Sequence, residues 1–173
     1  MLSVREIKAE DIELLLDYWY HSDPDFLLGM GVDVNKMPER EEFKAMLEAQ
    51  LYAPYMYKKA YCLIWLLSGT PVGHCNVNPI EYGNKAYMHL HMWNSGERNR
   101  GDGTELVRMS IPFFFKNLRL EKLICQPYAL NTAPNKTLMK LGFTFLEEVL
   151  MIPGSINFEQ PVNRWELKWA DLK

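Results

Sequence analysis

The chain has 173 residues, which favours a single domain, and its 48% hydrophobic and 24% charged content is typical of a globular protein. Its formal net charge of -3 argues against a nucleic-acid or anionic-membrane partner, so any anion site must be local. The first residues lack the features of a secretory signal and no apolar stretch approaches a membrane span, so we expect a soluble, cytoplasmic protein.

The N-terminal part of the chain predicts a strand followed by two helices. Residues 3–7 alternate like a short strand, and apolar residues then recur at helical spacing from Ile12 to Trp19. A polar segment rich in turn-forming residues covers 21–37, and Pro38 is well placed to begin a second helix. The apolar face of that amphipathic helix would consist of Phe43, Met46, Leu47 and Leu51.

The middle of the chain predicts an antiparallel meander of three strands. Apolar runs at 60–67, 72–78 and 86–93 are separated by turn sequences at 68–71 and 79–84. In the third run the side chains alternate between the two faces of the sheet. His89 and His91 should therefore share one face, while Leu90 and Met92 project to the other.

The C-terminal part predicts two helices alternating with strands. A helix runs from about Asp102 towards Asn117, and a second one at 133–141 is stopped by Gly142. Strands are expected at 123–126, 143–150 and 162–169. We therefore predict one mixed α/β (α+β) domain over residues 1–173, with a mostly antiparallel, twisted sheet of six to seven strands flanked by about four helices.

The three cysteines do not suggest a disulfide or a metal site. Cys62, Cys75 and Cys125 are odd in number, far apart in the chain and each inside an apolar run. We expect buried, reduced thiols and no bound metal.

The segment from Arg98 to Glu105 follows a strand and opens a helix, where main-chain N–H groups are unpaired and attract phosphate. Gly101 and Gly103 would let a diphosphate approach the backbone, and Arg100 would add charge beside Arg98. The residues predicted to hold the diphosphate are Arg98, Asn99, Arg100, Gly101, Asp102, Gly103 and Thr104. In the alternative interpretation, the side chains of Asp102 and Glu105 cap these amides and the glycines only form a turn.

A second segment, at 131–143, lies one strand later and ends in Leu141-Gly142-Phe143. Together with Arg98, Gly101 and Gly103, it resembles the GNAT superfamily of N-acetyltransferases. In that family an Arg/Gln-x-x-Gly-x-Gly/Ala loop holds the coenzyme A diphosphate, and an Asn, matched here by Asn131, precedes a helix that closes in Leu-Gly-Phe. Within that superfamily, the sequence most resembles the branch that acetylates ribosomal-protein N-termini.

The resemblance implies a V-shaped cleft where the third strand splays from its parallel neighbour at 123–126. Acetyl-coenzyme A would be the cosubstrate, with its pantetheine arm along the strand at Met92 and Trp93. Asn131 would bind the pantetheine arm or the acceptor. Asn135 and Lys136 would lie near the phosphates of the coenzyme, although a lysine there also suits a solvated surface.

An amine acceptor is mostly protonated at pH 7, so direct transfer needs a proton acceptor. His89 and His91 are the candidate bases, with the loop carboxylates Glu81 and Glu97 as other options; either histidine can equally be structural. A general acid is harder to identify. The resemblance places a Tyr or a Ser in many relatives where this chain has Met139 and Pro134, which leaves Tyr128 as the nearest hydroxyl.

Several alternatives stay open at this point. The missing hydroxyls also fit a non-catalytic module that binds acyl-coenzyme A as a sensor, and the donor can carry a longer acyl group. The aromatic residues between 21 and 61 suit an apolar or cationic acceptor but can equally cover the core. The chain can be a monomer or a homodimer.

Overall fold

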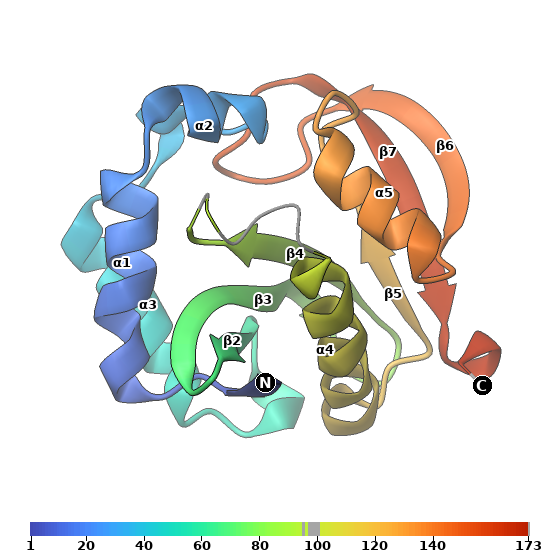
Figure 1. Ribbon diagram of the computed structural model, residues 1–173, viewed down its shortest axis with the longest axis horizontal. Helices are drawn as coiled ribbons and strands as arrows, with labels where there is room; N and C mark the ends of the chain where they lie inside the picture. Colours follow the sequence, from blue (N-terminus) through green and yellow to red (C-terminus); the bar gives the residue numbers. More distant parts are fainter. Residues whose placement is uncertain (95, 97–100, 173) are drawn as a thin grey trace.

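The computed structural model describes residues 1–94, 96 and 101–172, which form one seven-stranded sheet with helices on both faces (Figure 1). The sheet order is β1-β2-β3-β4-β5-β7-β6. The strands are β1 Leu2–Glu6, β2 Tyr61–Leu67, β3 Thr70–Glu81, β4 Lys85–Met92, β5 Lys122–Cys125, β6 Thr144–Met151 and β7 Gln160–Lys168. The predicted mixed, mostly antiparallel sheet is confirmed.

The described residues form five α-helices, one more than the sequence predicts. They are α1 Ile12–His21, α2 Pro24–Gly29, α3 Arg40–Leu51, α4 Asp102–Leu118 and α5 Thr132–Lys140. The short helix α2 lies in the segment interpreted as irregular. It forms because Pro24 stands at its start and the Asp23 carboxylate accepts a hydrogen bond from the main-chain N–H of Asp25 at 2.7 Å.

The predicted second helix is observed as α3, but it starts later and is less buried than its pattern suggests. Its N-cap is Glu39, so Pro38 precedes the helix and does not begin it. Phe43 and Leu47 are half-buried against α1 and the sheet, whereas Met46 is 56% exposed. None of the described helices is both long and apolar enough to cross a membrane.

The two faces of the meander β2–β4 are covered by different helices. Figure 1 shows α1 and α3 together on one side and α4 on the other. Leu15 of α1 packs on Ile64, while Leu106 and Phe114 of α4 belong to the larger core with Leu63. The three cysteines are buried and free, as predicted, and burial raises the pKa of each thiol.

The sheet consists of two antiparallel arms that share only a short parallel ladder. Strand β4 pairs with β5 at Lys85↔Lys122, Ala86↔Leu123 and Tyr87↔Ile124, and there the pairing ends. Beyond Tyr87 the main-chain ladder stops, and the last contact between the two strands is the hydrogen bond from Cys125 Sγ to the Met88 carbonyl at 3.0 Å, while β4 continues to Met92. The predicted parallel pairing and the splay between the two central strands are therefore present.

At the open end of the splay, the loop before β7 is bonded to the segment that follows α2. Gln160 is only 1% exposed, and its Nε2 donates to the Gly31 carbonyl at 2.8 Å. Asn157 Nδ2 donates to the same carbonyl at 2.8 Å, and the Asp33 N–H donates to the Ile156 carbonyl at 2.8 Å. We refer to residues 31–36 and 154–160 as the clasp; Figure 1 shows the loop before β7 reaching α2.

The clasp predicts that adding one methyl group at Gly31 strongly lowers the unfolding free energy. Gly31 has φ +85°, and a Cβ there would lie 2.3 Å from Gln160 Oε1. Gly69, in the β2–β3 turn, has φ +83°, and a Cβ there would have nothing within 4 Å, so it is a matched control. Gly69→Ala should cost about 1–2 kcal/mol of unfolding free energy from the backbone conformation alone. Gly31→Ala should cost about 1–3 kcal/mol more, because it also displaces the Gln160 side chain.

Urea unfolding of the two variants and the parent measures this difference. Equal losses in the two glycine variants would show that the clasp tolerates the added methyl group and that the contact is loose.

Candidate functional site

The splay between β4 and β5 contains a cavity of about 570 Å³ that reaches both faces of the sheet. From β4, the lining residues are Leu90, His91 and Met92; Trp65 of β2 also contributes. The start of α4 contributes Gly101, Gly103, Thr104 and Val107, and the α5 region contributes Asn131, Ala133, Pro134, Lys136, Thr137 and Lys140. Tyr18 of α1 and Asp25, Phe26, Gly29 and Met30 complete the wall from the opposite side.

The main chain of β4 presents polar groups to this cavity. The Trp93 N–H donates to the Val72 carbonyl of β3 at 2.9 Å, and the pairing of His91 with His74 continues the same register. In an antiparallel ladder the intervening residues point their N–H and C=O groups to the other edge. Those residues are Leu90 and Met92. The main chain of Met92 therefore has the orientation predicted for a coenzyme contact. The Trp93 N–H does not, because it is hydrogen-bonded to β3.

The start of α4 has no side chain as its cap. Gly101 is the N-cap with φ 86°, a conformation that favours glycine, and Asp102 is the first helical residue. The Glu105 carboxylate accepts a hydrogen bond from Arg108, one turn along the helix. The alternative capping-box interpretation is therefore wrong for the part of the chain that the structure describes.

Space next to these amides is open. Among the described residues, a Cβ built on Gly101 would have nothing within 4 Å, and one on Gly103 would meet only Met92 Cε, at 3.8 Å. Thr104 lines the cavity, whereas Asp102 is half-buried beside it. The predicted contacts of Arg98, Asn99 and Arg100, and the optional base Glu97, lie outside the described residues.

The residues predicted in the α5 region differ in what they do. Asn131 is the N-cap of α5 and lines the cavity, and the exposed Lys136 lines it too. Asn135 does not line it. Its Nδ2 donates to the carbonyls of Tyr128 and Asn131, at 3.2 and 2.8 Å.

The Asn135 side-chain oxygen is also occupied. It accepts from Asn163 Nδ2 at 3.0 Å and from Trp165 Nε1 at 2.9 Å. All of its amide groups are thus bonded within the protein, so Asn135 joins α5 to β7, and the geometry gives it no coenzyme contact.

The two candidate bases occupy different environments. His91 lines the cavity, and its Nδ1 lies 3.1 Å from the Tyr18 hydroxyl. His89 is on the same face of β4 but does not line the cavity, and its Nε2 lies 3.0 Å from the Asn78 carbonyl. The structure therefore brings His91, and not His89, to the splay.

His91 lies in a cluster of aromatic rings. It stacks on His74 of β3 with the ring centroids 4.5 Å apart, and it meets Trp19 edge-on at 4.9 Å. His74 is 2% exposed, and its Nδ1 accepts a hydrogen bond from Trp93 Nε1 at 2.8 Å. Because an indole N–H only donates, His74 Nδ1 carries no proton.

Burial keeps both stacked imidazoles neutral. It lowers the pKa of His74 to about 3, with His89 adding to the shift. Burial and the neighbouring histidines also lower the pKa of His91 well below its ordinary range, and burial lowers the pKa of His89. A neutral imidazole at pH 7 is the form that can accept a proton.

The structure does not bring a predicted general acid to the cavity. The Tyr128 ring lies edge-on against Phe158, with centroids 5.7 Å apart, and Tyr128 is not among the lining residues. Pro134 lines the cavity but has no hydroxyl, and Met139 is 62% exposed and does not line it. The Tyr128 hydroxyl would thus have to move to reach His91, and so would a hydroxyl introduced at position 139.

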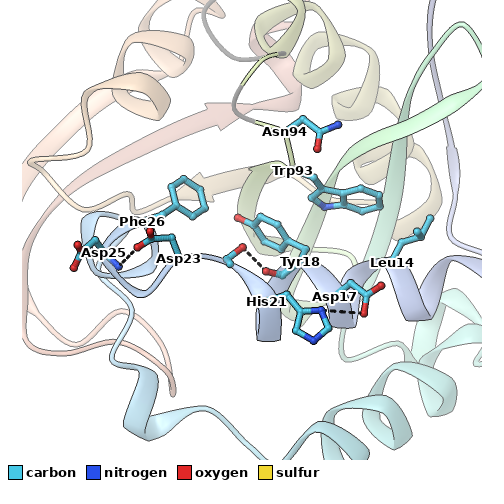
Figure 2. Close-up of a pocket in the computed structure, with 10 residues that line it drawn as sticks. Leu14, Asp17, Tyr18, His21, Asp23, Asp25, Phe26, Trp93 and Asn94 are labelled. Atoms are coloured by element: carbon cyan, nitrogen blue, oxygen red, sulfur yellow. Dashed lines mark hydrogen bonds and ion pairs between the residues drawn. The ribbon is translucent and has the colours of Figure 1, made fainter.

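A second, more open hollow of about 800 Å³ adjoins the cavity on the side of α1 and α2 (Figure 2). It shares Tyr18, Asp25 and Phe26 with the cavity. Figure 2 shows Asp17, Asp23 and Asp25 around it, with the Trp93 and Tyr18 rings between the acidic side chains and Asn94. The lining residues are Leu14, Asp17, Tyr18, His21, Ser22, Asp23, Asp25, Phe26, Trp93 and Asn94.

Sequence reasoning missed Tyr18, His74 and Met30. Tyr18 is adjacent in sequence to the apolar stripe that predicts α1, and nothing in its spacing marks it as functional. His74 had a usable signal, because a hairpin between the second and third predicted strands pairs it with His91. Within residues 1–94, 96 and 101–172, no group of three or more His, Cys, Asp or Glu side chains is arranged to hold a metal ion.

Comparison with known proteins identifies relatives at the level of family and fold. A family model described as "Acetyltransferase (GNAT) domain" matches residues 2–144. No curated protein matches the chain significantly in sequence.

Solved structures with a similar fold have little sequence identity to the chain. A spermidine N-acetyltransferase from Vibrio cholerae, in complex with coenzyme A and spermine, has a TM-score of 0.78 at 13% identity, covering 98% of this chain and 96% of that one. The ribosomal-protein-S5-alanine acetyltransferase from Vibrio fischeri has a TM-score of 0.78 at 17% identity, with coverages of 99% and 95%. An aminoglycoside acetyltransferase in complex with coenzyme A has a TM-score of 0.72 at 15% identity, with coverages of 98% and 96%.

The neutral histidine pair predicts how stability depends on pH. Both imidazoles have a lower pKa in the folded chain than the value of about 6.5 expected after unfolding, so the unfolded chain binds more protons below that pH. Each histidine should reduce the unfolding free energy by up to about 1.4 kcal/mol per pH unit as the pH falls below about 6.

Urea unfolding between pH 7 and 4.5 tests this prediction. His74→Gln and His91→Gln should each have a shallower pH dependence than the parent. Unchanged slopes in both variants would mean that the buried pair is protonated in the folded chain.

Proposed function

Because the chain belongs to the GNAT acetyltransferase family, we propose that it is an acetyl-coenzyme A-dependent N-acetyltransferase. Its acceptor would be a primary amine, either a protein N-terminus or a small amine. The observation that carries this proposal is the cavity that passes between β4 and β5, with an uncapped helix start on one side and His91 on the other. A donor and an acceptor can meet there from opposite faces of the sheet.

The residues on the α4 and α5 side suit coenzyme A. Helix α4 directs its first main-chain N–H groups at the cavity, and Gly103 keeps them accessible to a diphosphate. Lys136 and Lys140 add positive charge along the same wall. The outward main-chain groups of Leu90 would pair with the amides of the pantetheine arm, which would run past Met92, and Asn131 would hydrogen-bond beside them.

The opposite side suits a cationic acceptor. Asp17, Asp23 and Asp25 surround the outer hollow, and Asp25 also reaches the cavity itself. Carboxylates around an opening concentrate ammonium ions at it, and the Trp93 and Phe26 rings offer aromatic surface to a cation. An amine would therefore enter past α1 and α2 and approach the thioester from the side of His91.

Transfer would be direct, without a covalent enzyme intermediate. The acceptor is mostly an ammonium ion at pH 7 and first releases one proton to solvent water. The neutral amine nitrogen then bonds to the thioester carbonyl carbon, the C–S bond breaks, and coenzyme A leaves as a thiolate. The second proton, which the nitrogen releases as it bonds to carbon, goes to His91, which stays neutral at pH 7 and touches the cavity. The low basicity of His91 is adequate because the N–H groups become acidic as the nitrogen bonds to carbon.

The developing negative charge on the carbonyl oxygen needs a hydrogen-bond donor. The Leu90 N–H is a candidate, because Leu90 is adjacent to His91 and directs its main-chain groups to the splayed edge. The thiolate of coenzyme A is a sufficiently stable leaving group to depart without an acid, which agrees with the absence of Tyr128 from the lining.

A second candidate function is a non-catalytic module that binds acyl-coenzyme A. It is favoured by the non-hydroxyl residues at Pro134 and Met139 and predicts binding without turnover. A donor with a longer acyl group is a variant of the first proposal, and acyl-coenzyme A esters of increasing chain length would distinguish it.

The proposed diphosphate site predicts that Gly103→Ala weakens coenzyme binding without loss of stability. In the part of the chain that the structure describes, the added Cβ meets only Met92 Cε, so it should project into the cavity at the helix start. Alanine also favours the helix by up to about 1 kcal/mol over glycine, so the melting temperature should not fall. Calorimetric titration with acetyl-coenzyme A should show at least about a tenfold weaker Kd, which is roughly 1.4 kcal/mol.

Unchanged affinity in Gly103→Ala would place the diphosphate elsewhere. No thermal shift of the parent at millimolar acetyl-coenzyme A would falsify the proposed function as a whole.

The proposed base predicts different effects for the two histidines of β4. With a panel of peptides, polyamines and small amines, the parent should release free coenzyme A thiol. His91→Ala should lower kcat about a hundredfold or more with acetyl-coenzyme A binding intact, because a positioned base typically contributes that much. His89→Ala is the matched control and should retain kcat within a few-fold.

Binding without thiol release across the panel would instead support the non-catalytic module. Equal losses of kcat in both histidine variants would show that the position of His91 on the cavity does not identify it as the base.

A further inference from the structure

A hydrogen bond to a buried histidine holds the Trp93 indole beside the outer hollow. The indole Nε1 donates to His74 Nδ1 at 2.8 Å, and the two ring centroids are 5.9 Å apart. His74 is 2% exposed, whereas Trp93 is half-buried and lines the hollow together with Asp17 and Asp23 (Figure 2). One member of this pair thus lies in the core, and the other lies where an acceptor would enter.

The register of the sheet brings the two rings together. His74 of β3 pairs directly with His91 of β4, and residues two apart on a strand share a face. Trp93 therefore lies diagonally opposite His74, at a separation that aromatic side chains can bridge. The main-chain N–H of Trp93 donates to the Val72 carbonyl at 2.9 Å, which fixes the base of the side chain. The bond to His74 fixes its far end.

The chemistry of the two rings gives this bond one direction. An indole N–H only donates, so His74 Nδ1 is the acceptor and carries no hydrogen. Burial lowers the pKa of His74 to about 3, so this lone pair is available at pH 7. His74 also stacks on His91, with an angle of 19° between the rings, but it lines neither the cavity nor the hollow. It can therefore act on a ligand only through its neighbours.

We propose that His74 is a positioning residue for the acceptor, because it holds the Trp93 indole as a wall of the outer hollow against which a cationic amine binds. This inference rests on the proposed function, since it assumes that the amine enters through that hollow. The face of an indole attracts a cation within about 6 Å of its centre, and Asp17, Asp23 and Asp25 supply negative charge around it. Loss of the bond would free the indole to turn away. His74 should therefore affect how tightly the amine binds and not how fast it reacts.

The first test measures the bond itself, by ¹H–¹⁵N NMR of the indole groups at pH 7. The chain has five tryptophans, and Trp93→Phe identifies the Trp93 signal. His74→Phe keeps a ring in the stack but removes the acceptor, so the Trp93 indole hydrogen should exchange with solvent about tenfold faster than in the parent. Equal exchange rates in the two proteins would overturn the proposal.

Two substitutions at His74 separate the hydrogen bond from ring packing. His74→Phe loses the acceptor but keeps a ring against His91, whereas His74→Asn keeps an acceptor oxygen on Cγ and loses the ring. Amine affinity should weaken about tenfold in His74→Phe and stay near the parent value in His74→Asn. The reverse order would assign the effect to packing and refute the positioning role. Where the larger Phe ring destabilises the core, His74→Leu replaces it, since leucine also lacks an acceptor.

Amine affinity is measured by calorimetry in the presence of coenzyme A, with spermidine and a short peptide with a free N-terminus as probes. Trp93→Phe should weaken binding about as much as His74→Phe, and the double variant should bind no more weakly than either, because His74 acts through Trp93. Ser110→Ala is the matched control. It removes the acceptor of another buried indole, that of Trp65 at 2.9 Å, and should leave amine affinity unchanged.

Kinetics separate this inference from the proposed function. His74→Phe should raise the KM for the amine about tenfold, while kcat and the KM for acetyl-coenzyme A stay within a few-fold of the parent values. Additive losses in the double variant, or a loss confined to kcat, would contradict the inference and leave the activity established. Amine binding without turnover in the parent would refute the proposed function, while calorimetry would still decide the role of His74. A parent that binds neither amine would refute the inference.

Discussion

The site depends on the point where the hydrogen-bond ladder between β4 and β5 stops. Up to Tyr87 and Ile124 the main-chain groups of β4 and β5 are hydrogen-bonded to each other. Beyond that pair, β4 directs main-chain groups into the cavity. Buried peptide groups are costly unless they are bonded, so an opened parallel ladder is a polar edge that a ligand with amide groups can complete. Helices α4 and α5 place residues from their first turns at the same opening. The cavity is thus a consequence of sheet topology, and side chains refine it.

Charge is distributed unevenly around this opening, although the net charge of the chain is only -3. Lysines of α5 and the start of α4 lie on one side, and three aspartates lie on the other. Between them, His91 and His74 stay uncharged because aromatic rings exclude water from them. A neutral centre between a cationic and an anionic wall suits a reaction that brings together an anionic donor and a cationic acceptor.

Much of the fold was predictable from local patterns. Seven strands, the helices α1, α3, α4 and α5, and the alternation that separates His91 from Met92 all follow from periodicity. Helix α2 was not predicted, since its stability depends on a cap and on tertiary contacts and not on an apolar stripe. The site was less accessible to sequence reasoning, because Tyr18 reaches His91 across 73 residues of sequence and Asn135 is occupied by bonds to a distant strand. Such distant pairings leave no signal in spacing.

The clasp changes the mechanical character of the opening. A splayed sheet with a free end is a wedge, which can widen by bending either arm. Here residues 31–36 and 154–160 join the arms at the far end, so the wedge becomes a closed frame around a fixed aperture. The width of that aperture is therefore a joint property of two segments from opposite ends of the chain, and neither can be resized alone.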